Sequence, residues 1–172
     1  MHYGKIMECD IANGTGVRVS LFVSGCRNHC EKCFNPETWD FEYGKEFTDD
    51  TIGYILNLLS KPYIEGITLL GGEPMEPENQ PELLRLIRKM KERFPDKTVW
   101  CYTGYTIEKL LNTDEHCHCD VTFELLGMID VLVDGKYEKE LSDYSITFKG
   151  SSNQRIIDIK KSRGEGEIIL WT

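Results

Sequence analysis

The sequence predicts an α/β protein with a partial, open (βα) barrel of mostly parallel strands. Strand-like and helix-like segments alternate along the chain, which favours parallel strands joined by crossover helices. The 172 residues suit one domain but fall short of the roughly 250 residues of a complete βα barrel. Cysteine-rich and glycine-rich motifs come directly after strand-like segments, where parallel folds bind ligands. We therefore expect a single domain over residues 1–172.

The first half of the chain contains three periodic segments. Residues 17–23 alternate apolar and polar side chains, which is the two-residue period of a strand. Residues 49–59 place isoleucine and leucine at helical spacing behind two aspartates, and acidic residues suit a helix N-terminus. Residues 67–70 form an apolar run that stops at glycine and proline, so we expect a short buried strand there.

The second half continues the alternation. Residues 79–94 predict an amphipathic helix, with Asn79 as its N-cap and Pro81 in the first turn. The remaining expected elements are a short helix over 107–111 and strands over 98–102, 129–133, 156–159 and 168–171. The order of these elements supports a mostly parallel sheet.

Composition and charge exclude several classes of protein. The net charge of -9 argues against nucleic-acid binding through phosphate neutralisation. No apolar run approaches the roughly 20 residues of a membrane-spanning helix, and the N-terminus shows no apolar signal-peptide core. We therefore expect a cytoplasmic protein with no nucleic-acid and no membrane partner. In that compartment the seven cysteines favour metal binding or catalysis over disulfides.

Three of the cysteines lie in the loop that follows the first strong strand. They are Cys26, Cys30 and Cys33, and this cluster loop spans residues 26–33. Thiolate is a soft ligand that suits iron–sulfur clusters, zinc or Cu(I), and three thiolates leave one iron of a cubane cluster open. From the spacing alone, two interpretations stay open: an iron–sulfur cluster, or a zinc knuckle completed by His29 or a distant cysteine.

The cysteine spacing, with Phe34 directly after it, resembles that of the radical S-adenosylmethionine (SAM) superfamily. A second motif, Gly71-Gly72-Glu73-Pro74, follows the short strand at 67–70. Alone it is compatible with a plain turn, because glycine permits tight backbone conformations. The same superfamily carries a GGEP turn that contacts the methionine half of SAM, so the two motifs together strengthen the resemblance and imply a barrel of the radical SAM type.

Further segments resemble one family in particular, the activating proteins of anaerobic (class III) ribonucleotide reductase. Those segments are residues 14–18, 22–26, 33–39, 100–105, 130–135 and 150–155. They extend over nearly the whole chain, and the short length is typical of that family. One departure is an expected insertion over about 113–126, which holds His116-Cys117-His118-Cys119. A variable surface loop is our default interpretation of that motif, and a local zinc site is the alternative.

The resemblance implies a definite chemistry. Cys26, Cys30 and Cys33 would hold one [4Fe–4S] cluster, and SAM would chelate the open iron. A one-electron donor such as flavodoxin would reduce the cluster, which would cleave SAM to methionine and a 5′-deoxyadenosyl radical. That radical would take a hydrogen atom from one glycine of the partner, anaerobic ribonucleoside-triphosphate reductase, and leave a glycyl radical. The chain would therefore be an activating oxidoreductase whose protein part binds and orients its cofactors.

The resemblance also implies the contacts with SAM. Residues expected along the adenine or at the methionine end are Lys32, Cys33, Phe34, Gly71, Gly72 and Glu73. Core packing is the alternative for Phe34, and a solvated turn is the alternative for Glu73.

Two aspartates lie at the two ends of the strand expected at 129–133, one near its start and one directly after it. Asp130 and Asp134 are expected either to bind ribose hydroxyls or a cation, or to make structural hydrogen bonds. Residues 150–155 are expected either at the mouth that receives the reductase or in a hairpin connection.

Two other functions stay open at this point. Activases of other glycyl radical enzymes, such as pyruvate formate-lyase, resemble the chain at the cluster loop but are longer. A non-catalytic zinc or iron–sulfur module that acts by protein contact belongs to a different class. Cleavage of SAM by the iron-loaded protein distinguishes an activase from such a module.

Overall fold

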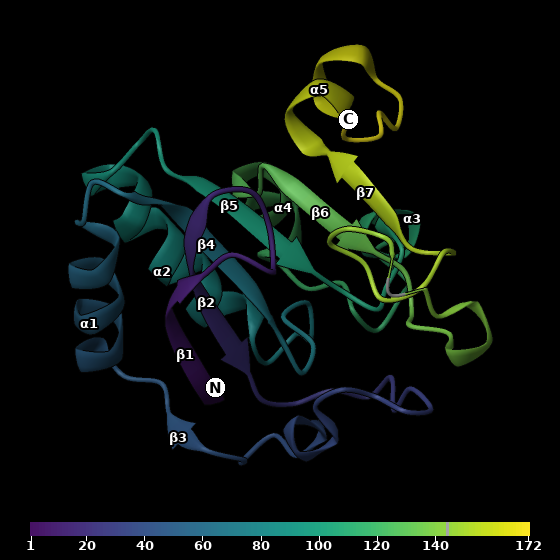
Figure 1. The fold of residues 1–172 in the computed structure, drawn as a ribbon, viewed down its shortest axis with the longest axis horizontal. Coiled ribbons are helices and arrows are strands. Elements are labelled where there is room, and N and C mark those ends of the chain that lie inside the picture. Colours follow the sequence, from purple (N-terminus) through teal and green to yellow (C-terminus); the bar gives the residue numbers. More distant parts are fainter. Residues whose placement is uncertain (144) are drawn as a thin grey trace.

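The computed structural model describes residues 1–143 and 145–172 and is built on one seven-stranded sheet (Figure 1). The strand order is β3-β1-β2-β4-β5-β6-β7. The strands are β1 His2–Asp10, β2 Val17–Val23, β3 Lys45–Glu46, β4 Ile64–Gly71, β5 Thr98–Tyr102, β6 Val131–Asp134 and β7 Arg155–Asp158. The pairings among β2, β4, β5 and β6 are parallel, whereas β1–β2, β1–β3 and β6–β7 are antiparallel. The expected α/β class and open sheet are confirmed, with parallel pairing in the middle of the sheet.

All five α-helices contribute residues to the main core, α5 through its first residue, Ile159. The helices are α1 Asp49–Leu59, α2 Gln80–Arg93, α3 Ile107–Leu111, α4 Thr122–Met128 and α5 Ile159–Glu165, and short 3-10 turns lie at Pro36–Trp39 and Lys139–Leu141. Helix α1 begins at a capping box in which Thr48 and Thr51 satisfy each other's backbone N–H groups. In the part of the chain that the structure describes, no helix combines the length and apolar character needed to cross a membrane.

The two faces of the sheet carry different side chains. In β5, Val99 and Cys101 join the helix-covered core, whereas Trp100 packs with β6 residues in a second cluster on the opposite face. Arg18 of β2 lies on this second face, 1% exposed, with Cζ 5.7 Å from the Trp100 ring centre. Its guanidinium donates to Thr68 Oγ1 at 2.8 Å and to other neutral oxygens. Arg18 and Trp100 thus pack against each other on the second face of the sheet.

Several elements differ from the sequence-based expectations. The antiparallel strand β1 was missed because its side chains are mostly half-buried and show no clean two-residue pattern. Helix α4 occupies part of the expected insertion at 113–126 and packs on α2, so that segment is not simply a loop. The strand expected at 168–171 is instead a single bridge between Leu170 and Ile157. Helix α5 was also missed.

Candidate functional site

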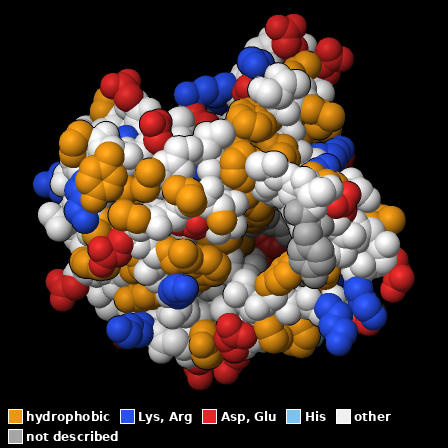
Figure 2. Space-filling view, viewed as in Figure 1, with side chains coloured by type: hydrophobic (Ala, Val, Ile, Leu, Met, Phe, Trp, Pro, Cys, Tyr) orange, Lys and Arg blue, Asp and Glu red, His pale blue; other side chains and the backbone are white. Residues whose placement is uncertain are grey.

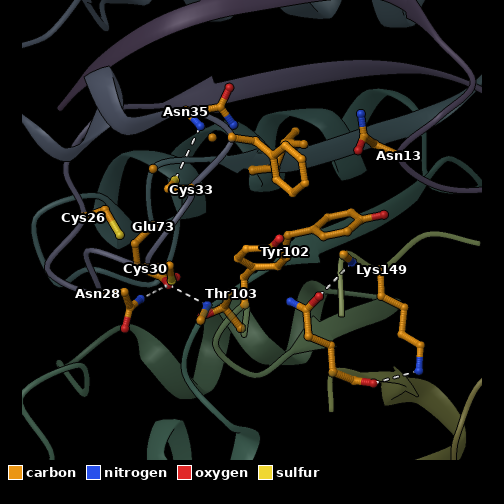
Figure 3. A pocket seen from close by; sticks show the side chains of 18 of the residues that line it. Asn13, Cys26, Asn28, Cys30, Cys33, Asn35, Glu73, Tyr102, Thr103 and Lys149 are labelled. Carbon is orange, nitrogen blue, oxygen red and sulfur yellow. Dashed lines mark hydrogen bonds between the residues drawn. The ribbon is translucent and has the colours of Figure 1, made fainter. Parts of the chain in front are cut away.

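A cavity of about 630 Å³ lies where the four parallel strands end (Figure 2, Figure 3). Each strand contributes its last residue or the residues that follow it, as expected for a parallel sheet. The residues that line it from these segments are Cys26, Gly71, Gly72, Glu73, Tyr102, Thr103, Gly104 and Gly135, with Cys30, Cys33, Phe34, Gly150 and Gln154 from the loops. The cysteine loop and the glycine turn, predicted separately, therefore share one site.

The cluster loop is anchored to its surroundings by its backbone. Gly25 N–H donates to Thr38 O at 2.8 Å, and Cys26 N–H donates to Trp39 O at 3.2 Å. Gly25 has φ +95°, and an added Cβ would lie 2.3 Å from the Phe41 ring, so only glycine fits there. This anchoring places the first cysteine at the inner end of the cavity.

The three thiols fit an iron–sulfur cluster better than a single metal ion. Burial raises the pKa of the Cys26 thiol to about 12, opposed by the backbone N–H groups of Asn28 and His29. A thiolate here therefore needs a cation beside it, which iron would supply. Within residues 1–143 and 145–172, no three His, Cys, Asp or Glu side chains are grouped around one metal-ion position. A cubane cluster takes each cysteine on a different iron and needs no such convergence.

The zinc-knuckle alternative receives no support from His29. Its ring stacks on Trp39, with ring centres 4.6 Å apart. His29 and Lys32 both adopt positive φ, at 43° and 58°, so the loop turns tightly between the cysteines. The histidine is thus used to pack the loop.

The glycine turn 71–74 is pressed against the start of the cluster loop. Gly72 N–H donates to Val23 O at 2.7 Å, and Glu73 N–H donates to Gly25 O at 2.8 Å. A Cβ on Gly72 would lie 2.8 Å from the carbonyl oxygens of Gly25 and Thr38, and Gly71 has φ +107°. Both glycines are therefore required by close backbone approach rather than by an ordinary exposed turn.

Glu73 is a buried carboxylate on the wall of the cavity. It is 1% exposed, so the alternative of a solvated turn residue was wrong. Its carboxylate accepts hydrogen bonds from Met75 N at 2.9 Å, Gly104 N at 2.7 Å and Asn28 Nδ2 at 2.9 Å. Burial is the largest influence on it and raises its pKa to about 7. Burial therefore keeps this carboxyl group protonated to a higher pH than that of an exposed glutamate.

The residues expected along the adenine differ in their placement. Phe34 lines the cavity, is 62% exposed and lies with its ring centre 5.3 Å from that of Tyr137, so core packing does not explain it. The Lys32 side chain is exposed and does not line the cavity. Any contribution of Lys32 to a ligand would have to come from its backbone.

The two aspartates make structural ion pairs. Asp130 lies before β6, at the opposite end of the strand from the cavity, and accepts from Val99 N at 2.7 Å and from Lys160 Nζ at 2.7 Å. Asp134 is fully buried at the other end of β6 and accepts from Ile107 N at 2.8 Å and Arg155 Nε at 2.9 Å. Neither lines the cavity. Both aspartates therefore make the structural hydrogen bonds that were one of the two expectations for them.

The segment 116–119 is not a loose surface loop. Cys117 is fully buried, and its carbonyl accepts from Gln80 Nε2 at 2.8 Å. His116 Nε2 lies 2.9 Å from the Tyr105 hydroxyl, whereas His118 Nδ1 lies 2.8 Å from Leu110 O. The segment is a loop, as expected, but Cys117 is buried and the loop is tied to the rest of the fold. Its two histidines contact different partners instead of converging on a metal.

Sequence reasoning missed several residues of the cavity. Tyr102 is the last residue of β5 and Thr103 follows it, so the strand-end rule that located the glycine turn applies to them as well. The Tyr102 hydroxyl is buried, has no hydrogen-bond partner among residues 1–143 and 145–172, and points away from the cysteines (Figure 3). Asn13 and Lys149 come from loops that carry no motif, so only the fold reveals them.

Comparison with known proteins places this site in a family. The family described as "4Fe-4S single cluster domain" matches residues 12–157. The chain is 42% identical to the anaerobic ribonucleoside-triphosphate reductase-activating protein of Enterobacteria phage T4, over 91% of this chain and 93% of that protein. It is 38% identical to the proteins of the same name from Escherichia coli K12, over 90% and 96%, and Vibrio cholerae, over 91% and 97%.

The chain belongs to the anaerobic ribonucleoside-triphosphate reductase-activating proteins. The resemblance drawn from the motifs is thereby confirmed, as is the iron–sulfur character of the domain. Family membership also favours the reductase over pyruvate formate-lyase as the enzyme that is activated. The cavity with its three cysteines is the part of this activating protein that the 4Fe-4S description fits.

Proposed function

We propose that this chain is a radical SAM activase that generates the glycyl radical of anaerobic ribonucleoside-triphosphate reductase. One observation carries the proposal: the three cysteines 26, 30 and 33 line the same cavity as residues 71–73 of the glycine turn. Its volume of about 630 Å³ lies within the range of small-molecule sites. We also propose the cytoplasm as its compartment, because free thiols persist where the environment is reducing.

The three cysteines would hold one [4Fe–4S] cluster and leave one iron for SAM. When bound and reduced, the cluster would supply one electron that breaks the sulfonium C–S bond of SAM and yields methionine and a 5′-deoxyadenosyl radical. The loop fits this role because the backbone fixes Cys26 and because iron offsets the cost of a buried thiolate. The electron donor, flavodoxin or a similar protein, is proposed from the family resemblance alone.

The glycine turn would bind the methionine end of SAM. The N–H groups of Gly72 and Glu73 are already used within the protein, so the turn offers oxygen atoms. Oxygen acceptors and the ionised form of Glu73 suit the SAM ammonium group. Phe34 and the backbone at Lys32 and Cys33 would lie along the adenine.

The far part of the cavity would receive the glycine-bearing segment of the reductase. Asn13, Tyr102 and Lys149 line this part, which points away from the cysteines (Figure 3). Residues 150 and 154 also line the cavity, which supports the expectation that this stretch borders its mouth. The 5′-deoxyadenosyl radical would take one hydrogen atom from the glycine Cα and become 5′-deoxyadenosine.

The test is an anaerobic assay with reconstituted protein, dithionite and SAM. We expect 5′-deoxyadenosine from the protein alone and a glycyl radical signal by electron paramagnetic resonance (EPR) when the reductase is added. Cys30→Ala should lose both, whereas Cys9→Ala, at an exposed position, should retain both. A protein that assembles its cluster and never cleaves SAM would instead be an iron–sulfur binding module.

A further inference from the structure

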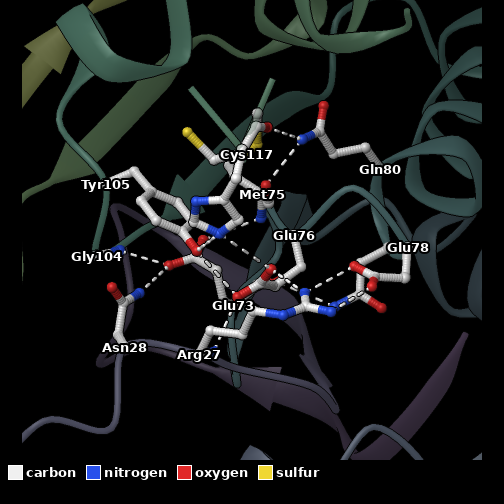
Figure 4. A network of polar contacts seen from close by, with 12 residues as sticks. Arg27, Asn28, Glu73, Met75, Glu76, Glu78, Gln80, Gly104, Tyr105 and Cys117 are labelled. Carbon is white, nitrogen blue, oxygen red and sulfur yellow. Dashed lines mark hydrogen bonds and ion pairs between the residues drawn. The ribbon is translucent and has the colours of Figure 1, made fainter. Parts of the chain in front are cut away.

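Two carboxylates near the glycine turn hold two consecutive residues of the cluster loop (Figure 4). Glu73 accepts from Asn28 Nδ2 at 2.9 Å. Glu76, three residues later, accepts from the backbone N–H of Arg27 at 2.8 Å and from its Nη1 at 2.5 Å. Arg27 directly follows Cys26, so the second contact reaches the residue next to a proposed cluster ligand.

Glu76 is an ionisable side chain that no step of the proposed reaction uses. Its side chain is 0% exposed. Burying a carboxylate is costly unless hydrogen bonds or opposite charge compensate it. Besides Arg27, the Tyr105 hydroxyl donates to it at 3.0 Å, and His116 Nε2 lies 3.9 Å away. Three donors, namely the backbone N–H and Nη1 of Arg27 and the hydroxyl of Tyr105, thus stabilise this carboxylate beside the cluster loop.

Arg27 is held on its other sides as well. Its Nη2 and Nη1 donate to Glu78 at 2.5 Å and 3.0 Å. Its Cζ lies 4.5 Å from the centre of the Phe41 ring. The two carboxylate partners differ in one respect that a test can use: the Glu76 side chain is fully buried, whereas the Glu78 side chain is 48% exposed.

We propose that Glu76 is a positioning residue that fixes the cluster loop through Arg27 and that its buried charge sets the reduction potential of the cluster. The proposal rests on the proposed function only in requiring a cluster on Cys26, Cys30 and Cys33. Reduction adds one negative charge to the cluster, so a nearby buried carboxylate disfavours the reduced form. Glu78 has little such effect, because water and salt screen an exposed charge.

The test compares Glu76→Gln with Glu78→Gln in anaerobically reconstituted full-length protein without SAM. The readouts are iron and sulfide content, the EPR spectrum of the reduced cluster, and the midpoint potential of its one-electron reduction. In Glu76→Gln we expect the midpoint to move to a more positive potential and the EPR lines to broaden, because the loop loses an anchor. In Glu78→Gln we expect both to match the unmodified protein.

A third variant separates charge from structure. Arg27→Gln keeps the backbone N–H that Glu76 binds but removes the neighbouring positive charge, so we expect the midpoint to move to a more negative potential. A purely structural role would not shift the two variants in opposite directions. Arg27 has a side chain 46% exposed, so this variant carries the test if Glu76→Gln does not fold.

Either of two results would overturn the proposal. One is an unchanged midpoint in both Glu76→Gln and Arg27→Gln; the other is an equal shift in Glu78→Gln. Because the unmodified protein is measured first and without SAM, absence of any cluster there would count against the proposed function instead.

Discussion

At the scale of single residues, the site depends on glycines, which have no side chain, as much as on the polar side chains beside them. Gly72 lets two backbone segments approach within hydrogen-bond distance, and the side chain of Glu73 beside it is buried on the wall of the cavity. The three cysteine thiols line the same cavity as this contact. Substitutions at Gly72 and Glu73 therefore test packing and charge separately.

Gly72→Ala should destabilise the protein by about 1–3 kcal/mol, because the new Cβ meets two carbonyl oxygens at 2.8 Å. Gly53→Ala is the matched control: Gly53 lies in α1 with nothing within 4 Å of its added Cβ, so alanine should stabilise the helix by about 0.5–1 kcal/mol. Urea unfolding of the iron-free protein measures both. Equal effects at the two positions would contradict the role given to Gly72.

Glu73 should make the stability of the iron-free protein depend on pH. Its pKa is raised by burial to about 7 in the folded state from 4.5, so the folded state holds the proton more tightly. The stabilisation is complete below pH 4.5 and is lost as the pH rises to about 7, by roughly 3 kcal/mol in total. Glu73→Gln should remove this part of the slope in urea unfolding measured across that range. Identical slopes in the two proteins would show that Glu73 is not the group responsible.

The sequence was most informative where a residue type has a single use. Three closely spaced cysteines and a double glycine after a strand predict the position of the cavity from the sequence alone. For Asp130 and Asp134 the residue type left ligand binding and structural hydrogen bonds both open, and only the contacts within the fold reveal the structural hydrogen bonds. Glu76 and Asn28 were invisible, since a buried carboxylate and its amide partner have no spacing rule and depend on the packing of distant segments.

At the scale of elements, the segment 116–119 braces the start of α2. Gln80, the first residue of α2, is fully buried, and its Nε2 donates at 2.8 Å to both Met75 O and Cys117 O. Its Oε1 accepts from Thr122 Oγ1 at 2.6 Å. The histidine and cysteine motif thus helps to hold the chain that leaves the glycine turn.

Gln80→Ala should lower the free energy of unfolding by about 2–4 kcal/mol, because it leaves two buried carbonyl groups without a donor. Glu92→Ala, at an exposed position of the same helix, should change it by less than about 0.5 kcal/mol. Chemical denaturation monitored by circular dichroism provides the comparison. A small effect at Gln80 would mean that water replaces the lost amide.

The sequence predicted the helices and strands with strong hydrophobic periodicity and missed those whose stability depends on contacts with other elements. Strand β2 and helix α1 match their expected bounds. Asn79 stands at the N-terminus of α2 as expected, yet its side chain donates to Ser24 O and Glu73 O instead of capping the helix. Strand β1 and helix α4 are stabilised by contacts with β2 and α2, which a local pattern does not contain.

At the scale of the whole molecule, cluster assembly should stabilise the fold. The cysteine loop, the glycine turn and the end of β5 border one cavity, so a group bound there links segments that unfolding separates. We expect anaerobic reconstitution to raise the free energy of unfolding by at least about 2 kcal/mol. The Cys26→Ser, Cys30→Ser, Cys33→Ser triple variant should show no such gain under the same treatment. A gain of equal size in the triple variant would point to iron bound elsewhere.

The two edges of the sheet limit the ways in which a partner protein can bind. Strand β3 is two residues long, and its side chains, Lys45 and Glu46, are exposed and charged. The outer edge of β7 is occupied by the chain's own C-terminal segment, where Trp171 N–H donates to Ile156 O at 2.9 Å and Asp158 N–H donates to Ile169 O at 3.0 Å. Such edges resist the addition of a foreign strand. A reductase that binds this protein must therefore be recognised by side chains and loops rather than by a strand added to the sheet.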